Sequence, residues 1–537
     1  MRYFTFIFIV ILTLFAVVLG AIWHSNWYWL LLITLPLSLL GIWDMLQPRH
    51  SLLRNYPLLA HLRWVFEGIR PEIRQYLMES DTEAIPFSRE QRGLVYERAK
   101  DTVDVHPFGT DLDVYGEKYA WLNHSTAPKP KQESCFCIKV GGTQCDKPYS
   151  ASVYNISAMS FGALSANAIR ALNKGARMGD FAHDTGEGSI SRYHREFGGD
   201  LIWEIGTGYF GCRSADGTFN VEMFAEQASN HQVKMIEIKL SQGAKPGHGG
   251  VLPGHKVSAE IAAARHVASG KDCLSPPGHS AFSTPVELLE FIQQLRNLSG
   301  GKPVGFKLCI GHRWEFLAIV KAMLETDILP DFIVIDGAEG GTGAAPLEFS
   351  NHIGTPLLEG LLFVHNALYG TRLRDQIKIG ASGKIVSAFD MVRVMSLGAD
   401  WCNAARGFMF ALGCVQSRSC HTNRCPTGVA TQDPRRQRAL VVEDKAQRVY
   451  HFHKNTLQAL AEVIAAAGLE HPCELRPYHF YLRSAPNTAI AANMVLDFLE
   501  PGELLEGTDN PLFKTNWLLA QAHSFAPLKP GRATIAK

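Results

Sequence analysis

The feature that most constrains the fold is a series of eight short apolar runs between residues 150 and 410, each closed by a glycine-rich or polar turn. Helix-like segments, with apolar residues about 3.6 positions apart, separate several of these runs. Strands that alternate with helices eight times predict a parallel α/β barrel, the (β/α)8 or TIM barrel. The expected strands are Tyr154–Met159, Asp180–Asp184, Lys234–Leu240, Cys273–Ser275, Val304–Leu308, Phe332–Asp336, Ile377–Ala381 and Asp400–Ala404.

The turns that follow the expected strands carry many of the glycines and polar side chains of this region. Among them are "SFGALS", "TGEGS", "SQGAKPGHGG", "SPPGH", "DGAEGGTG", "ASGK" and "ARG". In a barrel these turns share one rim, which is the face where active sites are built. The alternative fold, a doubly wound sheet, would usually show a G-x-G-x-x-G turn after its first strand, and none is present in that setting. We therefore expect a barrel with its site at the carboxyl ends of the strands.

Two uncharged apolar runs lie near the N-terminus, Tyr3–Trp23 and Trp27–Trp43. Each comes close to the ~20 helical residues that cross a bilayer, and tryptophans lie near their ends. A signal peptide is the alternative, but its apolar region would be shorter and a small-residue cleavage site would follow it. We expect residues 1–47 to form two transmembrane helices joined as a hairpin.

The positive charges that flank the two apolar runs are arginines. Arg2 precedes the first run, and Arg49, Arg54 and Arg63 follow the second. Positively charged flanks remain in the cytoplasm, so both ends of the hairpin are expected there. The body of the protein is then expected at the cytoplasmic face of the inner membrane.

The overall charge and the cysteine count exclude two classes of protein. The chain has 52 basic and 51 acidic residues, whereas a nucleic-acid-binding protein usually shows a basic face or stripe. Its 11 cysteines are odd in number and thinly spread, which does not suggest a secreted disulfide framework. After the hairpin we expect a juxtamembrane linker region at 48–149, the barrel domain at 150–440 and a helical C-terminal extension at 441–537.

Six segments together resemble a known family. They are similar to the FMN-binding synthase domain of glutamate synthase, and the resemblance covers roughly residues 150–470 in one uninterrupted order. The two apolar runs lie outside it, which suggests the smaller stand-alone relatives rather than the large multidomain enzyme. The segments are Ser157–Ser165 "SAMSFGALS", Thr185–Gly188 "TGEG", Gln242–Lys256 "QGAKPGHGGVLPGHK", Ser275–His279 "SPPGH", Gly340–Pro346 "GGTGAAP" and Cys414–Asp433 "CVQSRSCHTNRCPTGVATQD".

The resemblance implies a barrel with FMN at its C-terminal rim and a [3Fe–4S] cluster beside it. The glycines and the arginine that follow the last two strands lie where flavin barrels hold the FMN phosphate. Lys307 ends the strand "VGFKL" and would place a cation near flavin N1; a charge at that position needs a partner. The expected cofactor-binding residues are Met159, Ser160, Gln242, Lys307, Gly383, Arg406 and Gly407.

The resemblance also assigns three closely spaced cysteines, Cys414, Cys420 and Cys425, to the cluster, in the loop 414–425. Three thiolates suit a cuboidal cluster that lacks one iron, because four irons would need a fourth ligand. Zinc with His421 as the fourth ligand is an alternative, although Cys420 and His421 are adjacent and would have difficulty reaching one tetrahedral ion. Three buried apolar cysteines are another alternative. A looser group is expected to be ordinary thiols: Cys135, Cys137 and Cys145.

The synthase of this family reduces 2-iminoglutarate, formed from 2-oxoglutarate and ammonia, by hydride transfer from reduced FMN. Lys245 and Arg265 match positions that contact 2-oxoglutarate, and Glu187 matches an acidic residue that could handle a proton. We expect Glu187 and Lys245 to be catalytic, and Lys245 and Arg265 to bind substrate. The alternative for Arg265, in a helical stretch, is a surface arginine.

Two positions depart from the family pattern. The family's "GEGGQ" is "GHGGV" at Gly247–Val251, which replaces an acid with His248 and a substrate-contacting amide with Val251. These changes put the identity of the oxo acid in doubt. One alternative keeps both cofactors with a different oxo acid or related substrate, and another is a catalytically silent membrane scaffold.

Expected partners follow from what the sequence does not show. The large enzymes of the family begin with a glutaminase domain, whereas this sequence begins Met1-Arg2 and continues into an apolar run. We therefore expect ammonia to arrive free or from a separate glutaminase. No nicotinamide-binding fingerprint is visible. Electrons are expected from an external donor, a ferredoxin or a flavoprotein, through the cluster to FMN, and no nucleic acid is expected as a partner.

Overall fold

The computed structural model describes residues 3–48, 50–80, 86–117, 119–132, 136–485 and 488–529. Arg2, Arg49 and Cys135 lie outside these ranges. The chain forms two compact units, Met1–Glu83 and Ala84–Lys537. Within the described ranges the first unit is helical, and all the strands belong to the second.

The first unit contains two helices long and apolar enough to cross a membrane, as the sequence predicts. The first is α1 (Phe4–Ile22). The second, Ser25–Leu46, consists of the turn η1 (Ser25–Leu30) and α2 (Leu31–Leu46), and α2 packs against α1. Between the helices, Thr13 Oγ1 lies 2.9 Å from Ser38 Oγ. Most of their large apolar side chains are exposed, unlike those of a core helix, but a signal sequence passes the same test of length and composition. The unit continues with α3 (Ser51–Asn55), α4 (His61–Ile73) and the π-helical turn η2 (Arg74–Met78).

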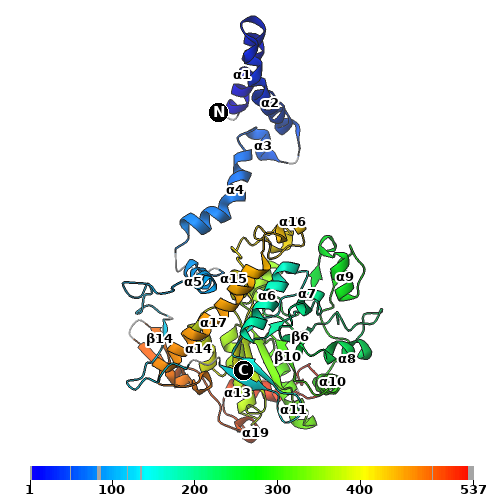
Figure 1. Cartoon of the computed structure of the whole chain (residues 1–537), viewed down its shortest axis with the longest axis vertical. Helices are drawn as coiled ribbons and strands as arrows, with labels where there is room; N and C mark the ends of the chain where they lie inside the picture. Colours follow the sequence, from blue (N-terminus) through cyan, green and yellow to red (C-terminus); the bar gives the residue numbers. More distant parts are fainter. Residues whose placement is uncertain are drawn as a thin grey trace. The chain divides into compact units, whose positions relative to one another are not determined.

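In the second unit, eight parallel strands close into a barrel (Figure 1). Each strand pairs with the next in chain order, and the last, β13, pairs with the first, β4. The predicted fold class, an α/β barrel of the TIM type, is therefore confirmed. The strands are β4 (Tyr154–Ile156), β5 (His183–Asp184), β6 (Leu201–Ile205), β7 (Val233–Lys239), β10 (Val304–Leu308), β11 (Phe332–Asp336), β12 (Lys378–Ser382) and β13 (Trp401–Ala404).

One of the eight expected barrel strands is wrong. Cys273–Ser275 lies outside the barrel, where β9 (Cys273–Leu274) pairs antiparallel with β8 (Val251–Leu252). The third barrel strand is instead β6, "LIWEI". Glu204 interrupts its apolar run and is buried against Lys307, just as Glu237 interrupts the run of β7.

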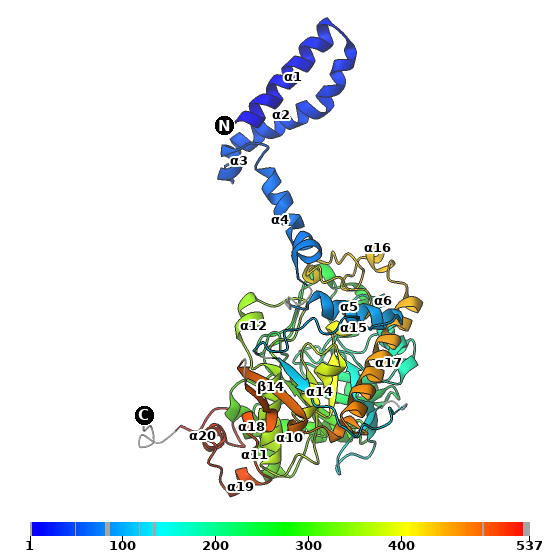
Figure 2. The same cartoon turned by 90° about the vertical axis from the view of Figure 1, so that its left-hand side faces the viewer.

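Helices surround the barrel, and their starts follow ordinary capping rules. Ser165, Thr284 and Ser387 each accept a hydrogen bond from a backbone N–H in the first turn of the helix they precede. The long helix α17 packs against α6 (Figures 1 and 2). The helices are α6 (Ala166–Gly179), α7 (Arg192–Arg195), α8 (Val221–Ser229), α9 (Ala259–Arg265), α10 (Pro285–Leu298), α11 (Arg313–Thr326), α12 (Leu347–His352), α13 (Leu357–Tyr369), α14 (Ala388–Ser396), α15 (Arg406–Ala411), α16 (Pro434–Gln437) and α17 (Val442–Ala466).

The described residues from 86 to 149, expected to be part of a linker, belong to the barrel unit. Helix α5 (Arg89–Lys100) packs against α15 and α17, and β1 (Ala120–Leu122) pairs with β14 of the C-terminal extension. Beyond α17 the chain folds back over the barrel unit. The remaining elements are η3 (Gly254–Lys256), η4 (Cys420–Thr422), η5 (Pro472–Glu474), η6 (Pro477–His479), β14 (Phe480–Ala485), β15 (Thr488–Ala491), α18 (Ala492–Val495), α19 (Glu503–Glu506) and α20 (Pro511–Leu519).

The barrel interior has an apolar lower layer and a polar upper layer. Because side chains alternate along a strand, Ile202 and Glu204 of β6 lie on the same face, toward the barrel interior. Ile202 belongs to the lower layer and Glu204, one step further along the strand, to the upper. Met235 and Glu237 divide in the same way on β7. The hairpin of β2 (Cys137–Val140) and β3 (Tyr149–Ser152) packs apolar side chains against this lower layer. The lower cluster consists of Val140, Ala151, Ala182, Ile202, Met235, Phe332, Val334 and Trp401.

Candidate active site

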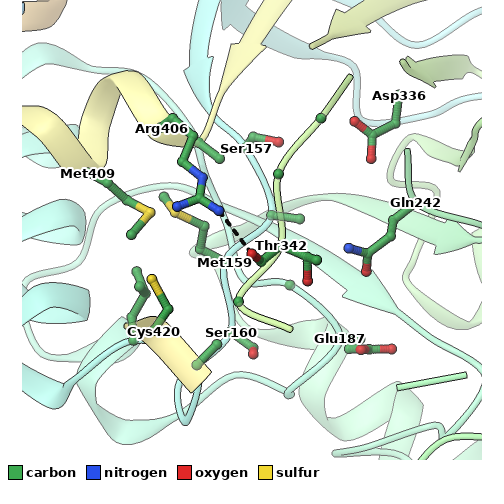
Figure 3. A pocket seen from close by; sticks show the side chains of 18 of the residues that line it. Ser157, Met159, Ser160, Glu187, Gln242, Asp336, Thr342, Arg406, Met409 and Cys420 are labelled. Carbon is green, nitrogen blue, oxygen red and sulfur yellow. Dashed lines mark hydrogen bonds between the residues drawn. The ribbon is translucent and has the colours of Figure 1, made fainter. Parts of the chain in front are cut away.

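A cavity of about 230 Å³ opens where the strands end at the carboxyl rim of the barrel. Figure 3 shows Met159, Met409 and Cys420 on one side of it. Gln242, Glu187 and Asp336 lie on the other side. Eleven of the thirteen predicted site residues line the cavity: Met159, Ser160, Glu187, Gln242, Lys245, Arg265, Lys307, Gly383, Arg406, Gly407 and Cys420.

Glu187, in the turn after β5, is surrounded by positive charge. Its Oε2 lies 3.1 Å from Lys239 Nζ, and Lys239 also donates to Gln242 Oε1 at 3.0 Å. Burial alone would raise the pKa of Glu187, but the charges of Lys239, Arg265 and Lys245 outweigh burial and hold this pKa below its ordinary value. Glu187 is therefore an ionised carboxylate at neutral pH.

Lys245 and Arg265 are buried cations with no acidic partner within 4 Å among the described side chains. Arg265 donates to the Phe161 carbonyl at 3.3 Å, lies 5.1 Å from the centre of the Phe210 ring, and leaves its Nε without a hydrogen-bond partner. Burial lowers the pKa of Lys245, and the charge of Glu187 opposes that shift. A buried cation without an acid is a site for an anionic ligand. Arg265, in α9, is thus not a surface arginine.

Lys307 reaches the cavity wall, but carboxylates below the wall hold its ammonium group. It pairs closely with Glu204, lies 2.9 Å from Glu237 Oε1 and 4.0 Å from Asp184 Oδ2. The partner that the sequence required for this charge is therefore an acidic cluster. Burial works to lower the pKa of Lys307, but the carboxylates raise it well above its ordinary value, so the side chain is charged. Its predicted contact with flavin N1 stays a prediction.

Arg406 and a glycine-rich turn form another part of the wall. Arg406 Nη2 donates to the Thr342 carbonyl at 3.0 Å (Figure 3). A Cβ on Gly341 would lie 2.6 Å from Arg406 Nε, so this close approach requires glycine. Gly383 and Gly407 bring further backbone to the cavity. Backbone N–H groups beside an arginine suit a phosphate, which is the group that FMN would place here.

The three cysteines lie on one loop that follows α15. Cys414 and Cys425 are buried, while Cys420 is partly exposed and lines the cavity. Burial, with the neighbouring thiols adding to it, raises the pKa of Cys414 to about 11. Burial opposes ionisation of Cys425 too, but hydrogen bonds from Ala430, Thr427 and Val429 lower its pKa below the ordinary value.

The same loop is fixed from two sides. Lys256 Nζ donates to the Cys420 carbonyl at 2.7 Å, and Tyr96 of α5 donates to the Cys414 carbonyl at 2.6 Å. Gln416 Nε2 donates to the carbonyl of Phe87, a residue that also lines the cavity. Three thiols on a loop held in this way suit an iron–sulfur cluster with three protein ligands.

Only one of the two departures from the family pattern lies at the cavity. Val251 lines it from β8 and is 47% exposed. His248 is not among the lining residues; its Nδ1 lies 2.7 Å from the Gly249 carbonyl and its ring is 5.1 Å from Phe349. A change in substrate preference would therefore act through Val251.

Several residues of the site escaped the sequence analysis. Lys239 pairs in register with Lys307 on the neighbouring strand, and its ammonium lies beside Glu187. A lysine at the end of a predicted strand indicates a side chain at the rim, and this reasoning was applied only to Lys307. For Lys256, the only sequence feature that indicated a role was its place in the segment Gln242–Lys256. Phe87 carried none, because it lies far from the barrel in sequence.

The comparisons with known proteins agree with this geometry. The profile described as the conserved region in glutamate synthase matches residues 124–470, more than half of the chain. The chain belongs to the glutamate synthase family. The matched span includes all eight barrel strands, the cavity residues apart from Phe87, and the three cysteines.

Two relatives show how far the family likeness extends. The glutamate synthase large subunit-like protein YerD of Bacillus subtilis is 37% identical over 503 residues, which cover 86% of this chain and 95% of that protein. The archaeal glutamate synthase (NADPH) of Methanocaldococcus jannaschii is 35% identical over 315 residues, 58% of each chain. Among solved structures, a mutant flavocytochrome b2 with pyruvate bound covers 88% of this chain and 95% of its own, at 11% identity and a TM-score of 0.41. The relative that matches over most of both chains, YerD, is thus itself named for its likeness to the glutamate synthase large subunit.

Proposed function

We propose that this chain is an FMN- and iron–sulfur-dependent oxidoreductase of glutamate synthase type, which joins ammonia to 2-oxoglutarate and reduces the resulting imine to glutamate. The observation that carries the proposal is one cavity whose wall holds a cysteine of the triplet and two cations that have no acid within 4 Å among the described side chains. These residues are Lys245, Arg265 and Cys420. Substrate and electron carrier would therefore meet in one place. Two buried cations favour a substrate with two carboxylates.

Lys245 and Arg265 would bind the carboxylates of the oxo acid. Both are buried, so each charge–charge contact would be screened less than at the surface. Arg265 is held by the Phe161 carbonyl and Phe210, and it lines the cavity with no acidic partner within 4 Å among the described side chains. Phe87 and Leu252 add apolar surface to the wall, which helps to keep water from the imine.

Glu187 would orient the nitrogen of the imine. An ionised carboxylate has no proton to donate, but it is a good acceptor for the N–H of a protonated imine. Lys239 fixes its Oε2 at 3.1 Å, which leaves the other oxygen for this contact. The protonated imine then needs only a hydride at carbon to become the amine. The source of that hydride would be FMN in its reduced form, when bound.

FMN would be held by chemistry that the cavity offers. Arg406 with the glycine backbone around Gly341 suits the phosphate, and Lys239 beside Gln242 offers positive donors for the electron-rich edge of the ring. Met159 and Ser160 would lie behind the ring, as expected from the sequence. A [3Fe–4S] cluster would be held by Cys414, Cys420 and Cys425, on the loop that Lys256 and Tyr96 fix.

We further propose that α1 and α2 anchor the protein in the inner membrane, with the barrel unit in the cytoplasm. Electrons would come from a ferredoxin or flavoprotein that docks at the cysteine loop. Arg418 and Arg424 are exposed on this loop and Arg435 on α16, and their charge suits an acidic donor. Ammonia would arrive free or from a separate glutaminase, and no nucleic acid is involved.

The test of the cofactor set is the visible spectrum of the full chain purified in detergent. We expect flavin and iron–sulfur absorbance after anaerobic reconstitution with FMN, iron and sulfide. Cys420→Ser should lose the iron and keep the flavin, while Cys473→Ser, a change at an exposed cysteine outside the loop, should keep both. A colourless reconstituted protein would refute both cofactor assignments, and normal iron in Cys420→Ser would refute the cluster ligands.

The substrate is tested by the rate at which the reduced flavin is reoxidised by 2-oxoglutarate plus ammonium. No acceleration over buffer would count against glutamate synthesis. A second candidate, a different oxo acid with the same cofactors, is favoured by the apolar side chain of Val251 at the wall. Val251→Gln should then raise the preference for 2-oxoglutarate, whereas His248→Glu, a change outside the wall, should leave it unchanged.

A further inference from the structure

A cluster of charged side chains lies directly beneath the cavity, in the upper layer of the barrel. Asp184, Glu204 and Glu237 come from three neighbouring strands, and their carboxylate oxygens lie within 4.8 Å of one another. Each of these residues is at most 2% exposed. Lys307, from β10, places its ammonium group against all three.

The cluster has too few donors for its oxygens. Glu204 and Glu237 Oε1 face Lys307, and Asp184 Oδ1 accepts from the Gly186 N–H at 3.0 Å. Glu237 Oε2 is buried and has no hydrogen-bond partner among the described residues. Three ionised acids beside one ammonium would leave about two net negative charges in a site closed to water, which is costly. A proton between two of the carboxylates would satisfy both the charge and the missing donor.

Within the described barrel, charged side chains from the neighbouring strands surround Glu237. Beside it on β6 is Glu204, on β5 Asp184, and on β10 Lys307. Asp336 of β11 lies farther along and accepts from the Gly243 N–H at 2.8 Å. Above, on its own strand, Lys239 is paired with Glu187. Below, the cluster meets the apolar layer that contains Met235 and Ile202, with no charged member.

This placement leaves the cavity as the route by which the cluster can exchange protons. Glu204 and Lys307 both line the cavity wall, although each is almost fully buried. Asp336 lines it as well. The apolar layer and the β2–β3 hairpin cover the opposite side. The cluster therefore borders the cavity. Under the proposed function, the charge inside this cavity would change during turnover.

We propose that Asp184, Glu204, Glu237 and Lys307 form a proton-holding site under the cavity floor, which keeps a proton shared by Asp184 and Glu237 and takes up another as the cavity becomes more negative. In that uptake one carboxylate becomes a carboxylic acid, and the proton comes from solvent through the cavity. Burial, with the neighbouring acids adding to it, raises the pKa of Asp184 well above its ordinary value and that of Glu237 to about 7, in keeping with shared protons. The site would set the charge beneath a bound flavin.

The first test needs no cofactor chemistry. Infrared spectra of the full chain, in a detergent without ester groups, should show a carbonyl band of buried carboxylic acid at pH 7 that shifts in D2O. Asp184→Asn and Glu237→Gln keep the side-chain size and should each remove or strongly weaken the band. Asp400→Asn is the matched control: Asp400 lies 2.8 Å from Arg374, accepts from the Ile379 N–H at 2.7 Å, and should not contribute to the band.

Three outcomes would overturn the proposal. One is no such band at pH 7, and another is a band that survives in both cluster variants. The third is one equivalent of a divalent metal that copurifies with the chain and is lost from Glu237→Gln, because a metal ion would then occupy the place of the proton.

A second readout rests on the proposed function. In the FMN-loaded chain, the midpoint potential of the flavin should fall more steeply with pH near 7 in the wild type than in Glu237→Gln. Equal slopes would refute the coupling between cluster and cavity. Failure to bind FMN would refute the proposed function instead, and the infrared result would stand apart from it.

Discussion

The barrel buries charge at both of its ends, and the two arrangements differ. At the lower end the one acid that pairs with Arg296 among the described residues is Asp331, whose Oδ2 lies 3.1 Å from both Nε and Nη2. Asp331 also accepts from the Gly142 and Val304 N–H groups at 2.9 Å each. At the upper end one ammonium, that of Lys307, faces three acids, and one oxygen of Glu237 has no donor.

The difference separates a structural ion pair from a cluster that can respond to its surroundings. The lower pair has matched charges and no unsatisfied carboxylate oxygen, so protonation would only weaken it. The upper cluster has an excess of acid, so its number of bound protons can change without loss of the ammonium contact. Only the upper cluster lies against the cavity.

The largest expected effect is at the lower pair. Asp331→Ala would leave the buried guanidinium of Arg296 without its acid, and we expect it to lower the free energy of unfolding by about 3–5 kcal/mol. Urea unfolding of the detergent-solubilised chain, followed by circular dichroism, measures it. A loss below about 1 kcal/mol would mean that the pair is not structural.

The next effect is a pH dependence at the upper cluster. The pKa of Glu237 is raised to about 7 from an ordinary 4.5, so between these values the folded chain binds more protons than the unfolded chain. Stability should therefore fall as pH rises from 4.5 to 7, by about 3 kcal/mol from this residue. Glu237→Gln should remove that fall. The same urea experiment at pH 5 and pH 8 measures it, and an unchanged slope in the variant would contradict the comparison.

The smallest effect comes from a neutral hydrogen bond outside both clusters. Tyr96→Phe removes the donor to the Cys414 carbonyl, at a cost of about 1 kcal/mol. The loss should be independent of pH, which makes this variant a baseline for the two charged ends. Iron content after reconstitution is the second measurement, and we expect it to fall more than in the control Tyr478→Phe, which changes an exposed tyrosine.

Much of the fold follows from local sequence. Seven of the eight strands could be predicted from the sequence. The prediction is clearest where a strand buried on both faces forms a nearly continuous apolar run, as "FIVID" does at β11. The position of the carboxyl rim could also be predicted, because glycine-rich turns follow those strands. The cavity residues follow from motifs in these turns, and the need of Lys307 for a partner follows from its place at a strand end.

The remainder depends on contacts between residues distant in sequence. β6 was not predicted, although "LIWEI" is as apolar as the predicted run of β7, which also carries an acid. The acid of β6, Glu204, is accommodated in the barrel by Lys307, 103 positions away. Cys273–Ser275 resembles a strand in isolation, but only its pairing with β8 shows that it belongs to the rim. Phe87 joins the site through Gln416, and no spacing in the chain indicates that contact.

The β2–β3 hairpin has a consequence for the order of events in turnover. Because it packs against the apolar layer at the lower end, the barrel offers no polar passage there among the described residues. Under the proposed function, the oxo acid, ammonia and the amino acid would all pass through the single rim where the cysteine loop lies. A glutaminase and an electron donor would then compete for the same face, and they would have to visit in turn.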